Sequence, residues 1–262
     1  MIGLIFGDTD FPKYIYKKIK DKKRYFIIDL SKKKIFRKDK NSKSVSLGQL
    51  GRIITLLKKN KCKRILFAGK VKKPIFSKLR LDLKGIYYIP RIIKKAKLGD
   101  AALLSEIIKI FKKEKIQTIS STIFTPELNL SKGSYSKYKP NLQDKTDIKN
   151  ALKALNKTNQ YSHIQGAVSK NNIVILEKKD GTQKMLKKIK KLKNISNGVL
   201  VKFPKKKQDY RVDLPTIGLN TLKQCNASGI KGIILKHRKN IFLDKKKSIN
   251  YANKNKMFIL VK

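Results

Sequence analysis

The sequence predicts an α/β protein with two domains. Short apolar runs alternate along the chain with segments whose apolar residues recur at helical spacing, a pattern typical of a parallel sheet with helices on both faces. The chain has 262 residues, of which 40% are hydrophobic, so two domains of ordinary size can each bury a core. We therefore expect an N-terminal Rossmann-like domain and a C-terminal domain of mixed α/β structure.

The first half of the chain shows the clearest alternation. Apolar runs predict strands at residues 2–6, 25–30, 64–68 and 116–119. Helical spacing predicts helices at residues 14–19, 47–59 and 101–113. Because ligands of parallel sheets bind beyond the carboxyl ends of the strands, we expect substrate contacts where the first and third strands end. The residues at these two ends are Gly7, Asp8, Gly69 and Lys70.

The apolar runs and the helical spacing both weaken between residues 121 and 147, where Pro and Gly interrupt a polar stretch. We place the domain boundary there, so the predicted domains are residues 1–131 and 132–262. The second half predicts helices at residues 147–156, 182–192, 219–227 and 245–254. It predicts strands at residues 166–169, 173–177, 199–203, 232–235 and 258–261. The first two of these strands form a hairpin about Asn171 and Asn172.

Charge and composition restrict the class of function. The chain has 66 Lys and Arg against 17 Asp and Glu, a formal net charge of +49. Such a charge favours nucleic acids or an anionic membrane surface. The basic residues are spread evenly and match no nucleic-acid-binding motif, which argues against a specific nucleic-acid partner. No segment has the apolar length of a membrane span, so we expect a cytoplasmic protein that touches membranes only at their surface.

Scarce cysteine and histidine argue against several metal and redox chemistries. Cys62 and Cys225 have no metal-binding spacing and predict buried thiols of a reducing compartment. Two histidines, His163 and His237, are too few for a histidine-based zinc site. A dinucleotide fingerprint is missing after the first strand, which counts against a nucleotide-sugar oxidoreductase.

The segment 208–218 holds the densest polar chemistry of the chain. In an extended segment, Asp209, Arg211 and Asp213 share one face because side chains alternate with a period of two. The carboxylates can then bind a divalent cation and the guanidinium a phosphate. A surface ion pair explains the same pattern, so the residues alone leave both interpretations open.

The predicted starts of two helices provide further candidate metal-binding and phosphate-binding residues. Glu177 ends a predicted strand and Asp180 follows it, and we expect Asp180 or Thr182 to cap the next helix. Both acids are also candidates to join the carboxylates of segment 208–218 around a metal. The helix predicted at 47–59 starts with two glycines, which suit either a phosphate at the helix N-terminus or close packing on the sheet.

Motifs spread over the whole chain together resemble a known family. In order, they are segments 2–12, 47–52, 68–74, 99–104, 180–182, 199–202 and 208–218. This arrangement resembles the LpxI family of UDP-2,3-diacylglucosamine pyrophosphatases of lipid A biosynthesis. The resemblance implies a cytoplasmic, Mg²⁺-dependent hydrolase with two α/β domains. Its substrate, UDP-2,3-diacylglucosamine, would be split at the pyrophosphate into UMP and 2,3-diacylglucosamine 1-phosphate.

The resemblance also implies partners. The substrate joins a nucleotide to a lipid with two acyl chains, so its head fits a soluble cleft while its tails stay in the bilayer. The basic surface would hold such an enzyme at the anionic inner membrane. A basic nucleic-acid-binding protein and a non-catalytic protein that binds a nucleotide lipid are the alternatives, and a homodimer is compatible with the sequence.

Residue roles follow from the same resemblance. Asp213 would be the leading catalytic residue, as metal ligand or general base, with Asp209 beside it and Asp180 as a further Mg²⁺ ligand. Arg211 and Lys202 would hold phosphate oxygens.

Substrate contacts would be completed by Thr182, by Gln165 and by the loops at Gly7-Asp8 and Gly69-Lys70, which would hold uridine or glucosamine. The chain departs from the family at Gln183, where an Asp is usual, and at Ser162-His163-Ile164, where only the following Gln165 is kept.

Overall fold

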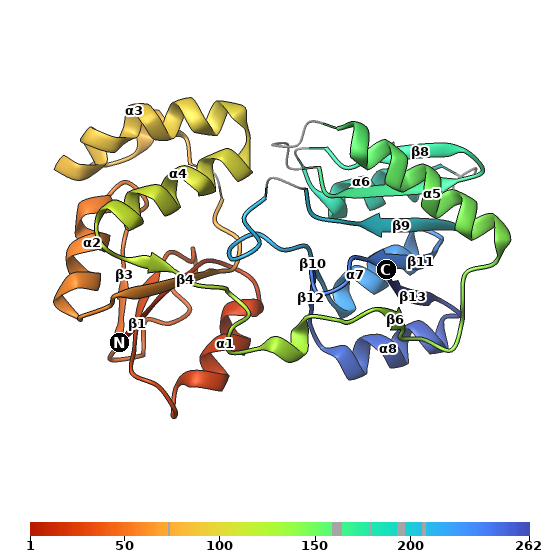
Figure 1. The fold of residues 1–262 in the computed structure, drawn as a ribbon, viewed down its shortest axis with the longest axis horizontal. Coiled ribbons are helices and arrows are strands. Elements are labelled where there is room, and N and C mark those ends of the chain that lie inside the picture. The colour runs from red at the N-terminus through yellow and green to blue at the C-terminus, as the bar shows by residue number, and fades with distance from the viewer. Residues whose placement is uncertain (73, 159–163, 179, 193–196, 206–207) are drawn as a thin grey trace. The chain divides into compact units, whose positions relative to one another are not determined.

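The computed structural model is an α/β protein that divides into two compact units (Figure 1). It describes residues 1–72, 74–158, 164–178, 180–192, 197–205 and 208–262. The first unit contains Met1–Pro126 and Asp209–Val212, and the second contains Glu127–Gln208 and Asp213–Lys262. The boundary between residues 131 and 132 stays a prediction.

The sheet of the first unit is parallel and has the strand order β3-β2-β1-β4-β5, which is the Rossmann order. Its strands are β1 (Ile2–Phe6), β2 (Tyr25–Asp29), β3 (Ser42–Ser44), β4 (Arg64–Ala68) and β5 (Gln117–Thr118). Every residue of β1 is buried, because this central strand has helices on both faces of the sheet. The predicted fold class is therefore confirmed.

The helices around this sheet are α1 (Phe11–Ile19), α2 (Leu50–Lys59), α3 (Leu83–Leu98) and α4 (Asp100–Lys113). Residues of α2, α3 and α4 share one core with Ile5 and Ile28 of the sheet. Figure 1 shows α1 on the opposite side of the sheet from α3 and α4. The sequence did not predict α3, which contains Gly85 and Pro90, two residue types that disfavour a helix interior.

One carboxylate, that of Asp82, ties α2 to α3. It accepts hydrogen bonds from three backbone amides, those of Gly51 (3.0 Å), Arg52 (2.8 Å) and Gly85 (2.8 Å). Asp82 thus caps α3 and also takes up free amides at the start of α2. A phosphate site at this N-terminus is therefore wrong. Close packing is right, but its partner is the segment before α3 and not the sheet: a Cβ on Gly48 would collide with the carbonyl oxygen of Arg80.

The second unit contains a mixed six-stranded sheet with the order β6-β13-β11-β9-β7-β8. The strands β9, β11 and β13 run parallel, whereas β6 and β7 run antiparallel to their neighbours. The bounds are β6 (Gly133–Ser134), β7 (Gly166–Lys170), β8 (Ile173–Leu176), β9 (Gly198–Lys202), β11 (Ile230–Leu235) and β13 (Phe258–Val261). A separate ribbon pairs β10 (Thr216–Ile217) with β12 (Ile241–Phe242).

Helices cover both faces of this sheet as well. One face packs against α5 (Leu142–Lys157). The other face packs against α6 (Thr182–Ile189), α7 (Leu219–Ala227) and α8 (Lys245–Lys254). The predicted hairpin is confirmed: Asn171 and Asn172 both have positive φ, 45° and 67°, as a type I′ turn requires.

The predicted burial of both thiols is also confirmed, and burial raises the pKa of Cys62 to about 11 and that of Cys225 to about 12. The only histidine in the described ranges, His237, accepts a hydrogen bond from the Lys132 amide. None of the helices in the described ranges is long and apolar enough to cross a membrane.

Replacing Asp82 by Ala should destabilise the chain by about 2 kcal/mol, because three helix amides lose their acceptor. Burial raises the pKa of Asp82, but these backbone hydrogen bonds outweigh burial and lower it. The stabilisation is therefore present above about pH 4 and is lost as pH falls through the folded-state pKa. Urea unfolding of the full chain at several pH values measures both effects.

The matched control is Asp100→Ala at the start of α4, where the exposed carboxylate makes no hydrogen bond among the described residues. Equal unfolding midpoints for the two variants at pH 7 would contradict the role of Asp82.

Candidate functional site

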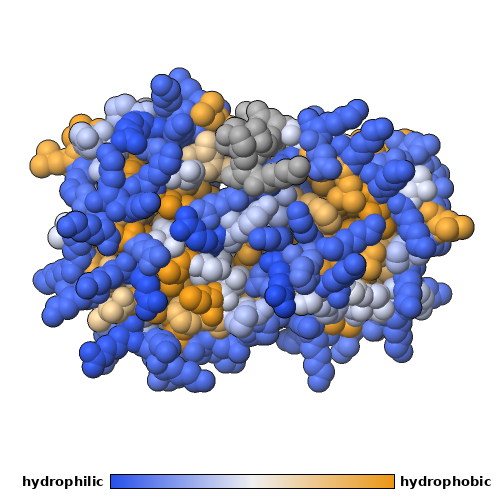
Figure 2. Space-filling view, viewed as in Figure 1, coloured by the Kyte–Doolittle hydropathy of each residue, from blue (hydrophilic) through white to orange (hydrophobic). Residues whose placement is uncertain are grey.

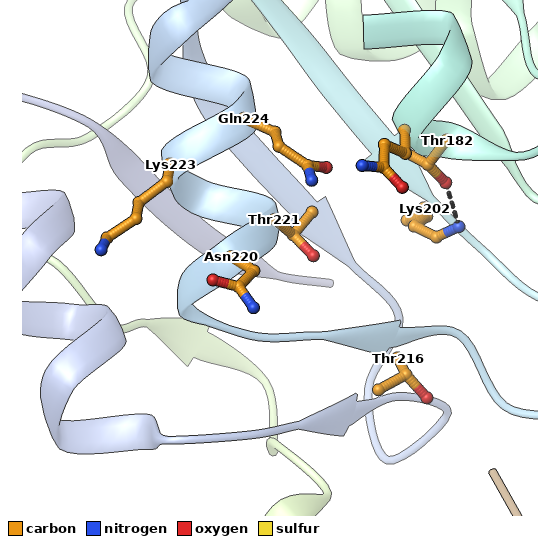
Figure 3. A pocket seen from close by; sticks show the side chains of 8 residues that line it. Thr182, Lys202, Thr216, Asn220, Thr221, Lys223 and Gln224 are labelled. Atoms are coloured by element: carbon orange, nitrogen blue, oxygen red, sulfur yellow. Dashed lines mark hydrogen bonds between the residues drawn. The ribbon is translucent and has the colours of Figure 1, made fainter. Parts of the chain in front are cut away.

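A polar pocket of about 520 Å³ lies in the second unit. Its walls come from the start of α6, the carboxyl end of β9, strand β10 and the first two turns of α7. The residues that line it are Thr182, Gln183, Lys202, Thr216, Asn220, Thr221, Lys223 and Gln224. Figure 3 shows Thr221 and Gln224 on the side of α7 that faces Thr182 and Lys202, whereas Lys223 points away. This volume is typical of small-ligand sites.

Two helices begin at this pocket without a side-chain cap. The N-cap of α6 is Gly181, whose φ of +83° favours glycine, and the N-cap of α7 is Gly218. Uncapped amides at helix N-termini carry partial positive charge and bind anions. The prediction that Asp180 or Thr182 caps α6 is therefore wrong, and the uncapped amides suit a phosphate.

A buried ion pair holds the cation of the pocket in place. Glu177 is 5% exposed and Lys202 is 8% exposed. Lys202 Nζ lies 3.5 Å from Glu177 Oε1 and donates to Thr182 Oγ1 at 2.5 Å, while Thr182 donates to Glu177 Oε1 at 2.6 Å. Burial alone would raise the pKa of Glu177, but the charge of Lys202 and the Thr182 hydrogen bond hold it below its ordinary value.

Gln165 connects this ion pair to Asp213. Its backbone amide donates to Glu177 Oε2 at 3.2 Å, and its side-chain Nε2 donates to Asp213 Oδ1 at 3.4 Å. The other carboxylate oxygen of Asp213 accepts from Gln208 Nε2. Four residues that the sequence predicted in the site therefore lie in one hydrogen-bonded network, joined through Glu177: Gln165, Thr182, Lys202 and Asp213.

Residues 209–212 form a turn in the first unit, closed by a 3.1 Å hydrogen bond from Val212 N to Asp209 O. Arg211 Nε and Nη2 donate to the Asp209 carboxylate at 3.0 and 2.6 Å, and Arg211 Nη1 donates to the Thr118 carbonyl at 3.1 Å. The hydrogen bond from Arg211 lowers the pKa of Asp209. The prediction of an extended segment with Asp209, Arg211 and Asp213 on one face is wrong, because a turn separates them.

The predicted Mg²⁺ ligands are not gathered into one cluster. Within the described ranges, no group of three or more His, Cys, Asp or Glu side chains is suited to hold a metal ion. Asp180 has a half-exposed side chain and pairs with Lys184 at 3.2 Å. Glu177 pairs with Lys202 instead of joining the other carboxylates.

The loops that follow β1 and β4 lie side by side in the first unit. Asp8 N donates to Lys70 O at 2.9 Å and Lys70 N donates to Asp8 O at 2.7 Å. Gly69 has φ +87°, and a Cβ on Gly7 would lie 2.6 Å from the Lys70 carbonyl oxygen, so this close approach requires glycine at both positions. The four predicted residues are therefore brought together at the carboxyl end of the sheet.

The motifs and this architecture match a known family along almost the whole chain. Residues 1–128 match the family described as the LpxI N-terminal domain, and residues 131–260 match the LpxI C-terminal domain. The chain belongs to the LpxI family. It is similar to the UDP-2,3-diacylglucosamine pyrophosphatase LpxI of Caulobacter vibrioides. The two are 32% identical over 224 residues, which cover 82% of this chain and 80% of the relative.

Sequence analysis of this LpxI chain missed part of the pocket. Asn220, Thr221 and Gln224 line it from α7, and Gln208 holds Asp213. A usable signal was present: the three α7 residues are polar, lie at i, i+1 and i+4 on one helix face, and follow segment 208–218 directly. Among the positions where the chain departs from the family, Gln183 lines the pocket, while residues 162–163 lie outside the described residues.

Substituting Lys202 by Met should leave Glu177 buried without its cation and destabilise the chain by about 3–5 kcal/mol at pH 7. In this variant the hydrogen bonds from Thr182 and Gln165 remain, but no positive charge opposes burial, so the pKa of Glu177 should rise. Stability should therefore recover as pH falls toward 5 and be lost again as pH rises. Urea unfolding midpoints between pH 5 and 8 report the change.

The control is Lys184→Met, which removes the exposed partner of Asp180 and should shift the midpoint only slightly. A Lys202→Met protein with the stability of Lys184→Met at pH 7 would show that the buried pair is not required.

Proposed function

We propose that this LpxI-family protein hydrolyses the pyrophosphate bond of UDP-2,3-diacylglucosamine and releases UMP and 2,3-diacylglucosamine 1-phosphate in lipid A biosynthesis. The observation that carries the proposal is the pocket, in which two uncapped helix N-termini and the immobilised Lys202 face one polar space. The activity named for the Caulobacter relative supports it.

The pocket supplies what a pyrophosphate needs. In our proposal, amides at the starts of α6 and α7 and the Lys202 ammonium bind phosphate oxygens. Thr182 cannot rotate freely, because its hydroxyl is fixed between Lys202 and Glu177. These groups are already in place before substrate arrives, so charge that develops during P–O cleavage meets oriented donors without reorganisation.

Asp213 is the carboxylate that we propose to orient and deprotonate the attacking water. Amide groups of Gln165 and Gln208 bind its two oxygens, which sets the plane of the carboxylate. Gln165 is itself anchored to Glu177, so the positions of Asp213 and Lys202 are linked. We propose that Arg211, held by Asp209, binds a further phosphate oxygen.

Carboxylate oxygens are the ligands that Mg²⁺ prefers, so the chemistry of the proposed donors fits this ion. We propose Asp213 as the leading ligand, because the side-chain amides of Gln165 and Gln208 fix the orientation of its carboxylate. Bound there, Mg²⁺ would neutralise phosphate charge.

The first unit contributes the remaining proposed contacts. The loops at Gly7-Asp8 and Gly69-Lys70 bind uridine or glucosamine beyond the carboxyl ends of β1 and β4. A substrate with two acyl chains places the enzyme on the cytoplasmic face of a membrane, where its net positive charge favours anionic lipid.

The purified protein should release UMP from UDP-2,3-diacylglucosamine with Mg²⁺ and not with excess chelator. The substitution Asp213→Asn should lower kcat by about 10²–10³-fold, because a charge that positions the nucleophile is lost. UMP release measured by chromatography tests both. The control is Asp21→Asn, an exposed acid of the first unit. Folded wild-type protein that releases no UMP with Mg²⁺ would favour a role in binding nucleotide lipids.

Metal binding can be separated from activity by titrating the substrate-free protein with Mn²⁺ as a paramagnetic substitute for Mg²⁺. We expect Asp213→Asn to weaken Mn²⁺ binding at least about tenfold, since a hard cation loses an anionic oxygen. Asp21→Asn should bind as wild type does. Equal affinity of the Asp213→Asn and wild-type proteins would place the metal elsewhere.

A further inference from the structure

The helix α3 presents an apolar stripe to solvent. Leu83 is 87% exposed, Tyr87 is 67% exposed and Ile86 is 56% exposed. These residues occupy one side of the first turns of α3, and Pro90 continues the same side one turn later. Large apolar side chains exposed next to one another mark an interaction surface more often than single ones do.

Positive charge surrounds this stripe. The exposed side of α3 continues into Lys94 and Lys97, and α3 contains no Asp or Glu from Leu83 to Leu98. The segment that precedes the helix exposes Ile75, at 63%, together with Lys78. Figure 2 shows hydrophobic surface at both ends of the part of the first unit where Figure 1 places α3, with hydrophilic surface between them.

The orientation of the stripe is set by the opposite side of α3. Gly85, Tyr88 and Ala96 are buried, and Tyr88 belongs to the core that α3 shares with α2, α4 and the sheet. Lys84 pairs with Glu114, and Arg91 pairs with Glu106 at 2.7 Å. Glu106 lies in α4 and Glu114 directly follows this helix. Together with the Asp82 cap, these contacts hold the apolar stripe outward.

We propose that this side of α3 docks on the surface of an anionic bilayer. Leu83, Ile86 and Tyr87 would enter the boundary between headgroups and acyl chains, and Lys94 and Lys97 would contact anionic headgroups. Charge favours lipid over a second copy of this chain, because a symmetric contact through α3 would bring like charges together.

This proposal rests on the proposed function, because an enzyme that hydrolyses a lipid substrate has to reach that substrate in the membrane. Asp82, the N-cap of α3, binds amides at the start of α2, the helix that follows β3, so α3 begins at the carboxyl edge of the parallel sheet, the edge at which Gly69 and Lys70 follow β4. Docking through the first turns of α3 would therefore bring that edge toward the lipid surface. Vesicles without substrate test the docking independently of catalysis.

The chain contains no Trp, so one substitution makes a specific reporter. Tyr87→Trp should show a blue-shifted emission and quenching by brominated lipid on vesicles of phosphatidylcholine and phosphatidylglycerol in a 3:1 ratio. Leu142→Trp, at a residue that is 80% exposed on α5, is the control and should show neither change. Equal quenching of both reporters would overturn the proposal.

Co-sedimentation with the same vesicles tests the apolar stripe. The triple variant Leu83→Ser/Ile86→Ser/Tyr87→Ser should bind at least about tenfold more weakly than wild type. The matched control removes three exposed apolar residues of the second unit, with Leu142→Ser/Ile173→Ser/Leu192→Ser, and should bind within about twofold of wild type. Wild-type binding by the α3 variant would overturn the proposal.

A charge pair separates local docking from the effect of net charge. Lys94→Glu/Lys97→Glu should weaken binding more than about tenfold, whereas Lys246→Glu/Lys247→Glu, exposed on α8, changes the net charge equally and should have a much smaller effect. Equal losses would assign binding to overall charge and overturn the proposal. Sedimentation velocity that shows a wild-type dimer dissociated by the serine variant would overturn it in favour of a contact between copies.

Discussion

The polar architecture of the second unit depends on one buried carboxylate, that of Glu177. A buried charge is costly unless it is paired and hydrogen-bonded, and Glu177 meets this requirement with donors from three segments. Lys202 comes from the end of β9, Thr182 from the start of α6 and Gln165 from the residue before β7. Because this one carboxylate must be neutralised and hydrogen-bonded, it fixes the end of β9 and the start of α6 close to each other.

That arrangement explains why Lys202, among the many lysines of this chain, is suited to bind a phosphate in the pocket. Most Lys side chains in the described ranges are exposed, and an exposed Lys loses rotamer freedom when it binds an anion. The Lys202 side chain is buried along its length and held by Glu177 and Thr182, so this cost is met during folding. Asp213 is coupled to the same anchor through Gln165, which links the proposed phosphate contacts to the proposed base.

The segment 208–218 contains residues of both units. Asp209 and Arg211 satisfy each other in a turn of the first unit, whereas Asp213 is held by amides in the second. Only three residues separate the two acids, yet they belong to different units. A family motif that looks like one cluster in sequence thus consists of an ion pair and a separate carboxylate.

The sequence by itself determined the α/β class, most of the elements and the family. Periodicity depends on which side chains a helix or strand must bury, so α7, α8 and β13 could be predicted to the residue. It failed at α3, where contacts with α4 and the Asp82 cap outweigh the low helix propensity of Gly85 and Pro90. Only the tertiary structure decided which group each charge meets. Asp82 accepts a hydrogen bond from an α2 amide 30 residues away in sequence, and Lys202 pairs with Glu177, 25 residues away. No sequence pattern specifies a partner over such separations.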